Sequence, residues 1–200
     1  MIGILSYGLG NILAVKNVFD DINVNCKFLD NPSDINNQIK KIVLPGVGSF
    51  DQAMSLLGKK KFIDPLKQFV KDEKNMLLGI CVGMQILAND SEEGNRQGLG
   101  LIPGTVRKFE NIRPIPHVGW NDVTPVKDGF TLLGQSEINK FYFLHSFYFD
   151  PINKNHTIGF SKYFYNFSSI IRDKNIIGVQ FHPEKSHLSG QKFFKKFSEL

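Results

Sequence analysis

Cysteine is scarce in this chain: only Cys26 and Cys81 occur among its 200 residues. Two isolated cysteines provide neither the paired spacing of a zinc site nor the dense framework of a disulfide-stapled secreted domain. This scarcity favours a reducing compartment, and we expect a cytoplasmic protein. It also leaves no cysteine-based metal centre, and we expect the protein to work without a metal or a cofactor.

Long apolar runs are also missing. No stretch approaches the roughly 18 consecutive apolar residues that a membrane-spanning helix needs. The N-terminal stretch "MIGILSYGLGN" has no basic region, and Gly and Asn interrupt its apolar run after a few residues. Both features are unlike a signal peptide. We therefore expect no contact with a membrane.

The charge excess is too small to define a class of partner. Lysine and arginine number 24 against 19 acidic residues, which gives a formal charge of +5. The lysines are dispersed, apart from short runs at 59–61 and 192–196 that are typical of a solvated face. We expect no nucleic-acid partner, and an acidic protein or an anionic substrate explains the excess equally well.

The first half of the chain alternates short apolar runs with amphipathic stretches, and 42% of all residues are hydrophobic. The runs predict buried strands at 2–6, 26–30, 41–46 and 75–80. Apolar residues at helical spacing predict helices at 11–22, 49–57 and 62–73, and Pro and capping residues predict a short helix within 31–39. This order predicts an α/β fold: an open, mostly parallel, flavodoxin-like sheet flanked by helices.

The second half has a different pattern. Prolines at 103, 114, 116 and 125 break the helical periodicity, and β-forming residues gather at 140–149, 156–164, 168–173 and 176–183. A final helix is predicted at 189–200. With no repeat or linker in view, we expect one domain over residues 1–200, with an antiparallel, β-rich second half.

Cys81 lies in "GICVG", directly after the predicted strand 75–80. This spacing matches the strand-to-helix elbow of nucleophilic serine enzymes, with sulfur in place of the hydroxyl. Glycines two positions away on either side let neighbouring segments approach, and the helix N-terminus favours negative charge on the sulfur. A buried structural cysteine between glycines remains the alternative for this motif taken alone.

His182 is the best-placed base among the five histidines, because it ends a strand and is followed by Glu184 in "FHPE". Side chains at i and i+2 of an extended segment point the same way, and Pro183 disfavours the helical conformation at His182. A carboxylate beside the imidazole would fix its tautomer and stabilise its charged form. A surface turn explains "HPE" alone equally well, but chance is a poor explanation for both motifs together.

Two further glycine motifs follow predicted strands. "LPGVGSF" at 44–50 ends at the same sheet edge as Cys81, and a peptide there, with the amide of Val82, would supply the two donors of an oxyanion hole. A plain strand-ending turn is the alternative.

"YGLGN" at 7–11 suggests a dinucleotide fingerprint, but Leu13 stands where the third glycine is required, so we do not expect nucleotide binding.

Taken together, "GICVGMQ" and "GVQFHPEKS" resemble the triad-type class I glutamine amidotransferases. "YGLGN", "LPGVGSF", "IPHVGWN" and "YFLHSFYF" are similar to the glutaminase subunits of imidazole glycerol phosphate synthases, from residue 2 to the last helix. The resemblance implies that Cys81 attacks the side-chain amide of glutamine and that His182, oriented by Glu184, moves the proton. Glutamate and ammonia are then released through a cysteine thioester.

The resemblance also implies roles for other residues. Gly48 and Val82 would serve the oxyanion, and the glutamine would be held by Gln85, Glu93 and the backbone of His145, Ser146 and Phe147. Asn11, Trp120 and Lys185 would face a separate (β/α)8-barrel cyclase subunit in a heterodimer. That subunit would receive the ammonia through a channel and make imidazole glycerol phosphate and aminoimidazole carboxamide ribotide for histidine biosynthesis. The glutaminase would idle until the partner is loaded, with the Val47–Gly48 peptide as its switch.

Some residues depart from the pattern expected in histidine biosynthesis. Ser6 stands where Asp is common, Val82 where Leu is common, and His187 follows Ser186. These resemble a second-copy form from surface-polysaccharide gene clusters, in which the ammonia would serve a sugar amidotransferase. Two further alternatives are a stand-alone Cys-His-Glu γ-glutamyl hydrolase, active without a partner, and a degenerate interaction subunit, which the complete triad disfavours.

Overall fold

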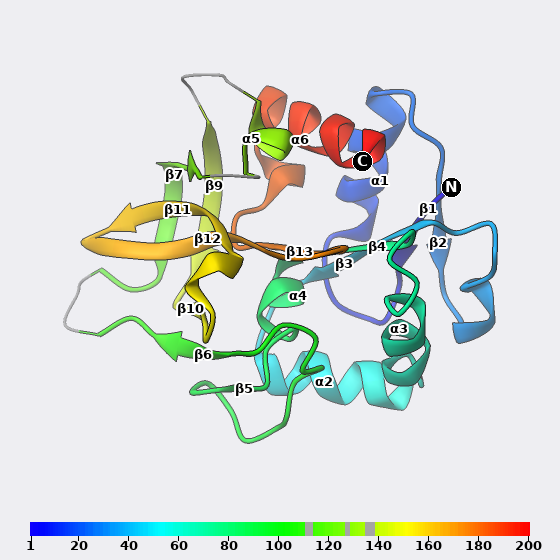
Figure 1. Cartoon of the computed structure of the whole chain (residues 1–200), viewed down its shortest axis with the longest axis horizontal. Helices are drawn as coiled ribbons and strands as arrows, with labels where there is room; N and C mark the ends of the chain where they lie inside the picture. Colours follow the sequence, from blue (N-terminus) through cyan, green and yellow to red (C-terminus); the bar gives the residue numbers. More distant parts are fainter. Residues whose placement is uncertain (111–113, 127–128, 135–138) are drawn as a thin grey trace.

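The computed structural model describes residues 1–110, 114–126, 129–134 and 139–200. At its centre, five parallel strands form one half of a long sheet (Figure 1). Their spatial order is β2 (Cys26–Leu29), β1 (Ile2–Leu5), β3 (Lys41–Gly46), β4 (Met76–Cys81) and β13 (Ile176–Val179). This is the flavodoxin-like order, in which ligands bind beyond the carboxyl ends of the strands.

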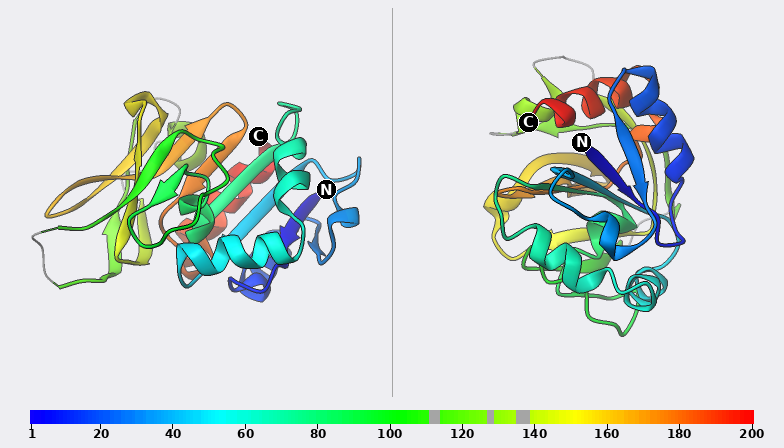
Figure 2. Two further views of the ribbon diagram at one scale, coloured as in Figure 1. Left: turned by 90° about the horizontal axis from the view of Figure 1, so that it is seen from below. Right: turned by 90° about the vertical axis from the view of Figure 1, so that its right-hand side faces the viewer.

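Helices cover both faces of the parallel strands, which is why these strands are apolar along their whole length. Helices α1 (Ile12–Asp21) and α6 (His187–Glu199) cover one face, and α2 (Phe50–Lys59) and α3 (Ile63–Phe69) cover the other (Figures 1 and 2). The central strand residues Ile4, Val43 and Leu78 are completely buried. Across one layer, the rings of Phe19 in α1 and Phe194 in α6 lie 4.7 Å apart.

The second half extends the same sheet with antiparallel strands. β12 (Tyr165–Asp173) pairs with β13, and β10 (Phe147–Pro151), β6 (Gly104–Lys108) and β5 (Asp90–Ser91) follow outward. β11 (Thr157–Tyr163) forms a hairpin with β12 and also pairs with β8 (Thr124–Pro125). The short helix α5 (Gly129–Leu133) lies in this half, whereas α4 (Val82–Gln85) directly follows β4 in the parallel half.

A separate two-stranded ribbon lies beside this sheet. It pairs β7 (His117–Asp122) with β9 (Lys140–His145) in antiparallel register. Because side chains alternate along a strand, Val118, Trp120 and Leu144 are exposed on one side, whereas His117 and His145 are buried on the other. The ribbon therefore has an outer apolar face and an inner face that packs on the β-rich half.

Aromatic side chains form the core of the β-rich half. Phe109 lies at its centre, and its ring is within 6 Å of those of Tyr148, Tyr163, Tyr165 and Phe167. Offset and edge-to-face ring contacts add stability beyond the burial of their apolar area. These aromatic residues therefore serve the packing of this half.

The predicted α/β fold with a β-rich second half is confirmed, but some boundaries were wrong. The region 140–149 belongs to two strands of different sheets, β9 and β10, with Ser146 between them. The segment 31–39 contains only a short 3-10 turn, Pro32–Asp34, and the strand predicted at 176–183 ends at Val179. In the described ranges, no helix is long and apolar enough to span a bilayer.

Candidate active site

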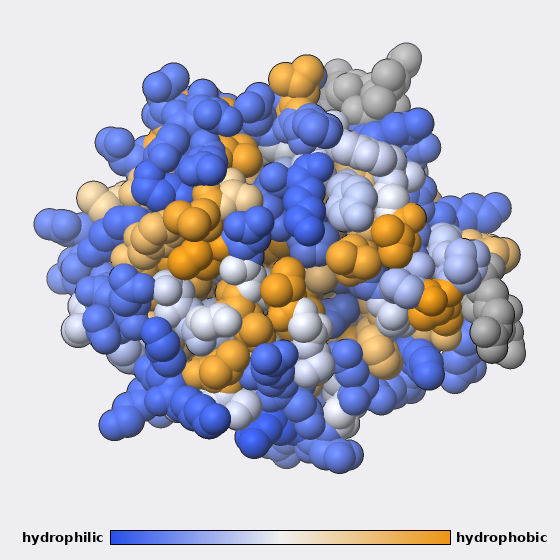
Figure 3. Space-filling model, turned by 180° about the vertical axis from the view of Figure 1, so that it is seen from behind, coloured by the Kyte–Doolittle hydropathy of each residue, from blue (hydrophilic) through white to orange (hydrophobic). Residues whose placement is uncertain are grey.

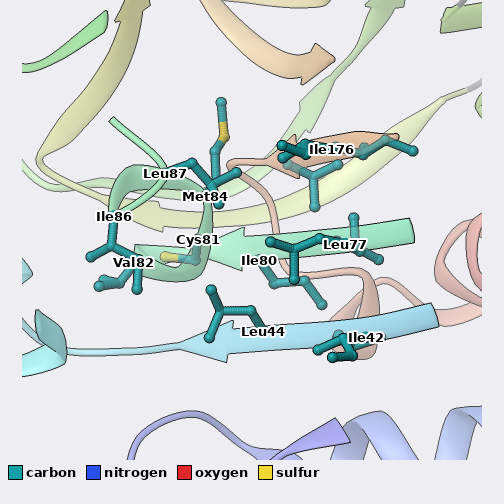
Figure 4. Close-up of a cluster of buried hydrophobic side chains, with 14 of the residues drawn as sticks. Ile42, Leu44, Leu77, Ile80, Cys81, Val82, Met84, Ile86, Leu87 and Ile176 are labelled. Carbon is teal, nitrogen blue, oxygen red and sulfur yellow. The ribbon is translucent and has the colours of Figure 1, made fainter. Parts of the chain in front are cut away.

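Cys81 ends strand β4 and begins helix α4, in a backbone conformation that L-residues rarely adopt. Its φ is 55° and its ψ is −112°. Figure 4 shows the side chain at the arrowhead end of β4, beside the end of β3, with Val82 in the turn that follows. Strained backbone of this kind costs about 1–3 kcal/mol and is concentrated at functional sites. The tight strand-to-helix turn predicted from "GICVG" is confirmed.

Close backbone packing explains the glycines around Cys81. A β-carbon on Gly79 would lie 2.4 Å from the carbonyl oxygen of Gly83, and one on Gly83 would lie 1.9 Å from that of Leu44. No side chain fits at such distances. The glycines therefore let β3, β4 and α4 meet at the sulfur, as the motif predicted.

His182 and Glu184 are held side by side just after β13, the strand that pairs with β4. The Nδ1 of His182 lies 2.8 Å from Oε1 of Glu184, and neither side chain is more than 3% exposed. His182 is extended, and its backbone N–H donates to the carbonyl of Tyr142 in β9. The Ser186 hydroxyl donates to the carbonyl of His182 and accepts the N–H of Tyr142. The ribbon strand β9 thus fixes the position of the imidazole.

The electrostatics of His182 favour its charged form. Burial alone would lower its pKa, but the nearby sulfur of Cys81 and the carboxylate of Glu184 outweigh burial and raise the pKa of His182 to about 10. A histidine of this kind is an imidazolium at neutral pH, paired with the sulfur on one side and the carboxylate on the other. Such pairing activates a cysteine nucleophile.

A pocket of about 280 Å³ opens directly onto the sulfur. Its wall contains the cysteine and histidine, the turn after β3, one acidic side chain and the segment that joins β9 to β10. The lining residues are Val47, Gly48, Cys81, Val82, Gln85, Glu93, Pro116, Leu144, His145, Ser146, Phe147 and His182. Small-molecule sites are concave clefts of this kind with a few convergent polar groups. A larger hollow of about 710 Å³ beside α2 does not contain a cysteine–histidine pair.

Comparison with known proteins agrees with this geometry. Residues 4–199 match the family model "Glutamine amidotransferase class-I". The chain belongs to the class I glutamine amidotransferases. It is 43% identical to the "Imidazole glycerol phosphate synthase subunit HisH" of Bdellovibrio bacteriovorus and 42% identical to the protein of the same name from Leptospira interrogans, in each case over the full length of both chains. The resemblance to these glutaminase subunits is confirmed.

Solved structures agree on the fold of this amidotransferase. A crystal structure of a glutamine amidotransferase covers 99% of the chain with a TM-score of 0.78 at 16% identity, and 97% of that structure is matched. The structure of PurLQS from Thermotoga maritima gives a TM-score of 0.76 at 17% identity, with 99% and 97% of the two chains covered. Identities this low support the architecture alone.

Two buried glutamines connect the amidotransferase pocket to the sulfur. The Nε2 of Gln85 donates to the carbonyl of Phe147 and to Oε1 of Gln180, both at 3.1 Å. The Nε2 of Gln180 in turn lies 3.8 Å from the sulfur of Cys81. Gln85 was predicted as a substrate residue, but Gln180 was missed. Its signal was an isolated polar residue between Val179 and Phe181.

Glu93 reaches the pocket from the loop after β5. Its carboxylate accepts the backbone N–H of Phe50, the first residue of α2, at 2.8 Å. Burial raises the pKa of Glu93, although the hydrogen bond from Phe50 opposes this shift. The structure brings this carboxylate into the same pocket as Cys81, as expected for a substrate-binding residue.

Gly48 and Val82 line the same pocket as Cys81. Gly48 has a φ of +98° in the turn between β3 and α2, a conformation that favours glycine. Val82 begins α4, and the first amides of a helix have no acceptor within the helix. Their oxyanion role stays a prediction.

The three predicted interface residues are exposed. Asn11 also caps α1, since its side-chain oxygen accepts the N–H of Ala14. The ring of Trp120 stacks on that of His187 at 5.4 Å, and the Lys185 ammonium lies 5.8 Å from the centre of the Tyr142 ring. On the face opposite to that of Figure 1, hydrophobic side chains gather between hydrophilic ones (Figure 3). No cluster of potential metal ligands occurs among the described residues.

Proposed function

We propose that this chain is the glutaminase subunit of an imidazole glycerol phosphate synthase, a single amidotransferase domain that acts in the cytoplasm. The observation that carries the proposal is the buried Cys81, His182 and Glu184 constellation at one pocket. Its relatives of about 40% identity bear the name of a subunit of that synthase.

In the first half of the reaction, the Cys81 thiolate attacks the side-chain amide carbon of glutamine. The carbonyl oxygen becomes an oxyanion, and the amides of Gly48 and Val82 stabilise it. The carbon–nitrogen bond then breaks while the His182 imidazolium gives its proton to the leaving nitrogen, which departs as ammonia. A γ-glutamyl thioester remains on Cys81.

In the second half, neutral His182 takes a proton from water. The resulting hydroxide attacks the thioester carbon, the carbon–sulfur bond breaks, and glutamate leaves with the thiolate regenerated. Glu184 holds the imidazole through Nδ1, so that Nε2 faces the sulfur and the substrate in both halves. This division of roles follows from the 2.8 Å contact between Nδ1 and the carboxylate.

Several pocket groups are suited to hold the glutamine. The Glu93 carboxylate would bind the α-ammonium group, and Oε1 of Gln85 would accept a hydrogen bond, because its Nε2 already donates to two protein acceptors. The backbone of His145, Ser146 and Phe147 lines the same pocket, where the Phe147 carbonyl accepts from Gln85. These assignments are supported by position and chemistry.

The partner we propose is a (β/α)8-barrel cyclase subunit that receives the ammonia without release into water. Its contact surface would include Asn11, Trp120 and Lys185, together with the exposed apolar residues Val118 and Leu144 of the ribbon. Val47 and Leu144 are exposed and also line the pocket, so this surface adjoins the pocket mouth.

Two assays test the proposal. Glutaminase activity is measured by glutamate release for the purified chain, with and without a cyclase subunit loaded with its ligand, and for Cys81→Ala. We expect activity that depends on Cys81 and rises with the loaded partner. Full activity of the chain alone would favour a stand-alone γ-glutamyl hydrolase.

Growth tests the pathway. A bacterial strain without its own glutaminase subunit is given the chain together with its cognate cyclase and grown without histidine. We expect growth with the wild-type chain and none with Cys81→Ala. Full glutaminase activity without growth would favour another ammonia acceptor, such as a sugar amidotransferase.

A further inference from the structure

Two buried histidines form a hydrogen-bonded pair at the pocket wall. The Nδ1 of His117 lies 2.9 Å from the Nε2 of His145, and the residues are only 4% and 6% exposed. They face each other across the inner side of the β7–β9 ribbon, where they are directly paired in register. None of the chemical steps proposed for Cys81 and His182 uses this histidine pair.

The direction of the hydrogen bonds in this pair can be derived from its surroundings. The Nδ1 of His145 lies 2.8 Å from the carbonyl oxygen of Phe147, which can only accept, so Nδ1 carries the proton. In a neutral ring the Nε2 of His145 is then an acceptor, and the Nδ1 of His117 must donate to it. Both rings therefore carry their proton on Nδ1.

The hydrogen bonds run in a series from Asn121 through His117 and His145 to Phe147. The Asn121 end of this series requires the same tautomer of His117. The side-chain nitrogen of Asn121 lies 3.2 Å from Nε2 of His117 and 2.9 Å from the carbonyl of Lys162. Its side-chain oxygen accepts the N–H of Asp122 at 2.8 Å. Two backbone groups thus fix the orientation of the amide, which presents a donor to His117. Only an unprotonated Nε2 can accept it.

Burial keeps the pair neutral. Burial lowers the pKa of His117 to about 4. The pKa of His145 falls to about 3, because burial, with smaller contributions from the neighbouring His117 and His182, outweighs the hydrogen bond to the Phe147 carbonyl. The His117 ring also stacks between those of Phe143 at 4.9 Å and Tyr163 at 4.1 Å. A flip of the His117 ring would break both hydrogen bonds, and a tilt out of its plane would break these ring contacts. One tautomer and one orientation are therefore stabilised together.

The other end of this series of hydrogen bonds, at Phe147, reaches the substrate pocket. The Phe147 carbonyl that accepts from His145 also accepts from Gln85, and Gln85 continues through Gln180 to the sulfur. His145 and Phe147 themselves line the pocket. The pair therefore restrains the part of the pocket wall at the bend where β9 ends and β10 begins.

We propose that His117 and His145 are positioning residues: a neutral pair, both protonated on Nδ1, that holds the 145–147 backbone in the geometry that binds glutamine. This rests on the function proposed above for the pocket. The reaction itself uses neither proton of the pair. Binding geometry depends on both, because a misplacement of about 1 Å in a pocket can cost a large factor in turnover or affinity.

Side-chain nitrogen NMR of the full chain, labelled with 15N-histidine, tests the tautomers without reference to activity. At pH 7 we expect both His117 and His145 to be neutral and protonated on Nδ1, although free neutral imidazole side chains mostly carry the proton on Nε2. His117→Asn identifies the His117 signals. Detection of either ring as the Nε2–H form or as an imidazolium would overturn the proposal.

Kinetics tests the positioning role. His117→Phe keeps the ring stacking but removes the donor to His145, whereas His117→Asn keeps a donor near the position of Nδ1. We expect KM for glutamine to rise roughly tenfold in His117→Phe with kcat changed by less than about threefold, and to recover partly in His117→Asn. His156→Asn, on a histidine outside the pocket beside Asp173, is the matched control and should leave both constants unchanged.

The outcomes separate this proposal from the function on which it rests. An inactive wild-type chain, with or without the loaded cyclase subunit, contradicts the proposed function but leaves the tautomer result standing. Equal KM values in a folded His117→Phe and the wild type would overturn the positioning role. If His117→Phe does not fold, the comparison of His117→Asn with wild type decides, since loss of the Asn121 contact should still raise KM measurably.

Discussion

Gly46, the last residue of β3, is paired in register with Cys81, the last residue of β4. A β-carbon on Gly46 would lie 2.5 Å from the backbone nitrogen of Gly83, within the turn that follows the sulfur. The nucleophile is therefore held by backbone contacts on the side of β3, and the closeness of three backbone segments determines where the sulfur points.

Replacement of Gly83 by Ala should destabilise the protein. The new β-carbon would meet the carbonyl of Leu44 at 1.9 Å, and a backbone group cannot move aside as a flexible side chain can. We expect the free energy of unfolding, measured by urea titration, to fall by about 1–3 kcal/mol or more. Gly58→Ala is the control: its β-carbon lies 3.7 Å from Ile63, and Ala should be neutral or stabilising in helix α2. Equal stability of Gly83→Ala and wild type would contradict this account of the turn.

Glu184→Gln should reduce kcat far more than it changes KM. An amide can present its N–H to Nδ1 of His182, which would favour the wrong tautomer and remove the charge that stabilises the imidazolium. We expect kcat for glutamine hydrolysis to fall roughly 10²- to 10⁴-fold. Glu73→Gln, an exposed carboxylate paired with Lys174, should behave like wild type. A Glu184→Gln variant with near-normal kcat would remove the carboxylate from the mechanism.

Glu93→Gln should act on binding. Loss of the carboxylate charge removes the group proposed to hold the α-ammonium of glutamine, so we expect KM to rise with little change in kcat. Because burial raises the pKa of Glu93, KM of the wild type should also rise as acidification protonates this carboxyl. The KM of Glu93→Gln should lack that rise. Parallel pH profiles of the two proteins would show that another group binds the ammonium.

Folding stability should fall between pH 7 and pH 5. The pKa values of His117 and His145, about 4 and about 3, lie below the ordinary value near 6.5, so the unfolded chain takes up two protons that the folded chain does not. Stability then decreases as the pH falls through 6.5. His182, with its raised pKa, is protonated in both states below 6.5 and adds no slope there. Urea titrations across this range should show a smaller loss in His117→Asn, and an identical loss would contradict the neutral pair.

Much of the parallel half could be predicted because its signals are local. The apolar runs at β1, β3 and β4 are buried on both faces, and the capping residues Asn11 and Ser49 mark the starts of α1 and α2. Cys81 ends β4 and His182 follows three residues after the end of β13, each beside residues that shape its backbone. Their convergence follows from the adjacency of β4 and β13 in one parallel sheet.

The β-rich half was harder to predict because its strands depend on distant partners. β6 and β7 follow prolines that obscure any local pattern. β6 pairs with residues of β10 that lie 39–47 positions later, and β7 pairs with residues of β9 that lie 18–28 positions later. The contacts that join His117 to His145, or Gln180 to Gln85, exist only after this pairing. Spacing therefore indicated the nucleophile, the base and the Glu184 carboxylate beside it, but not the hydrogen bonds between distant residues that support the pocket.

The covalent intermediate tests the central claim most directly. The chain, with its cyclase subunit present, is mixed with glutamine, quenched in acid during turnover, digested and analysed by mass spectrometry. We predict a γ-glutamyl thioester on the peptide that contains Cys81 and none on the peptide that contains Cys26. An adduct on Cys26, or turnover that persists in Cys81→Ala, would contradict it.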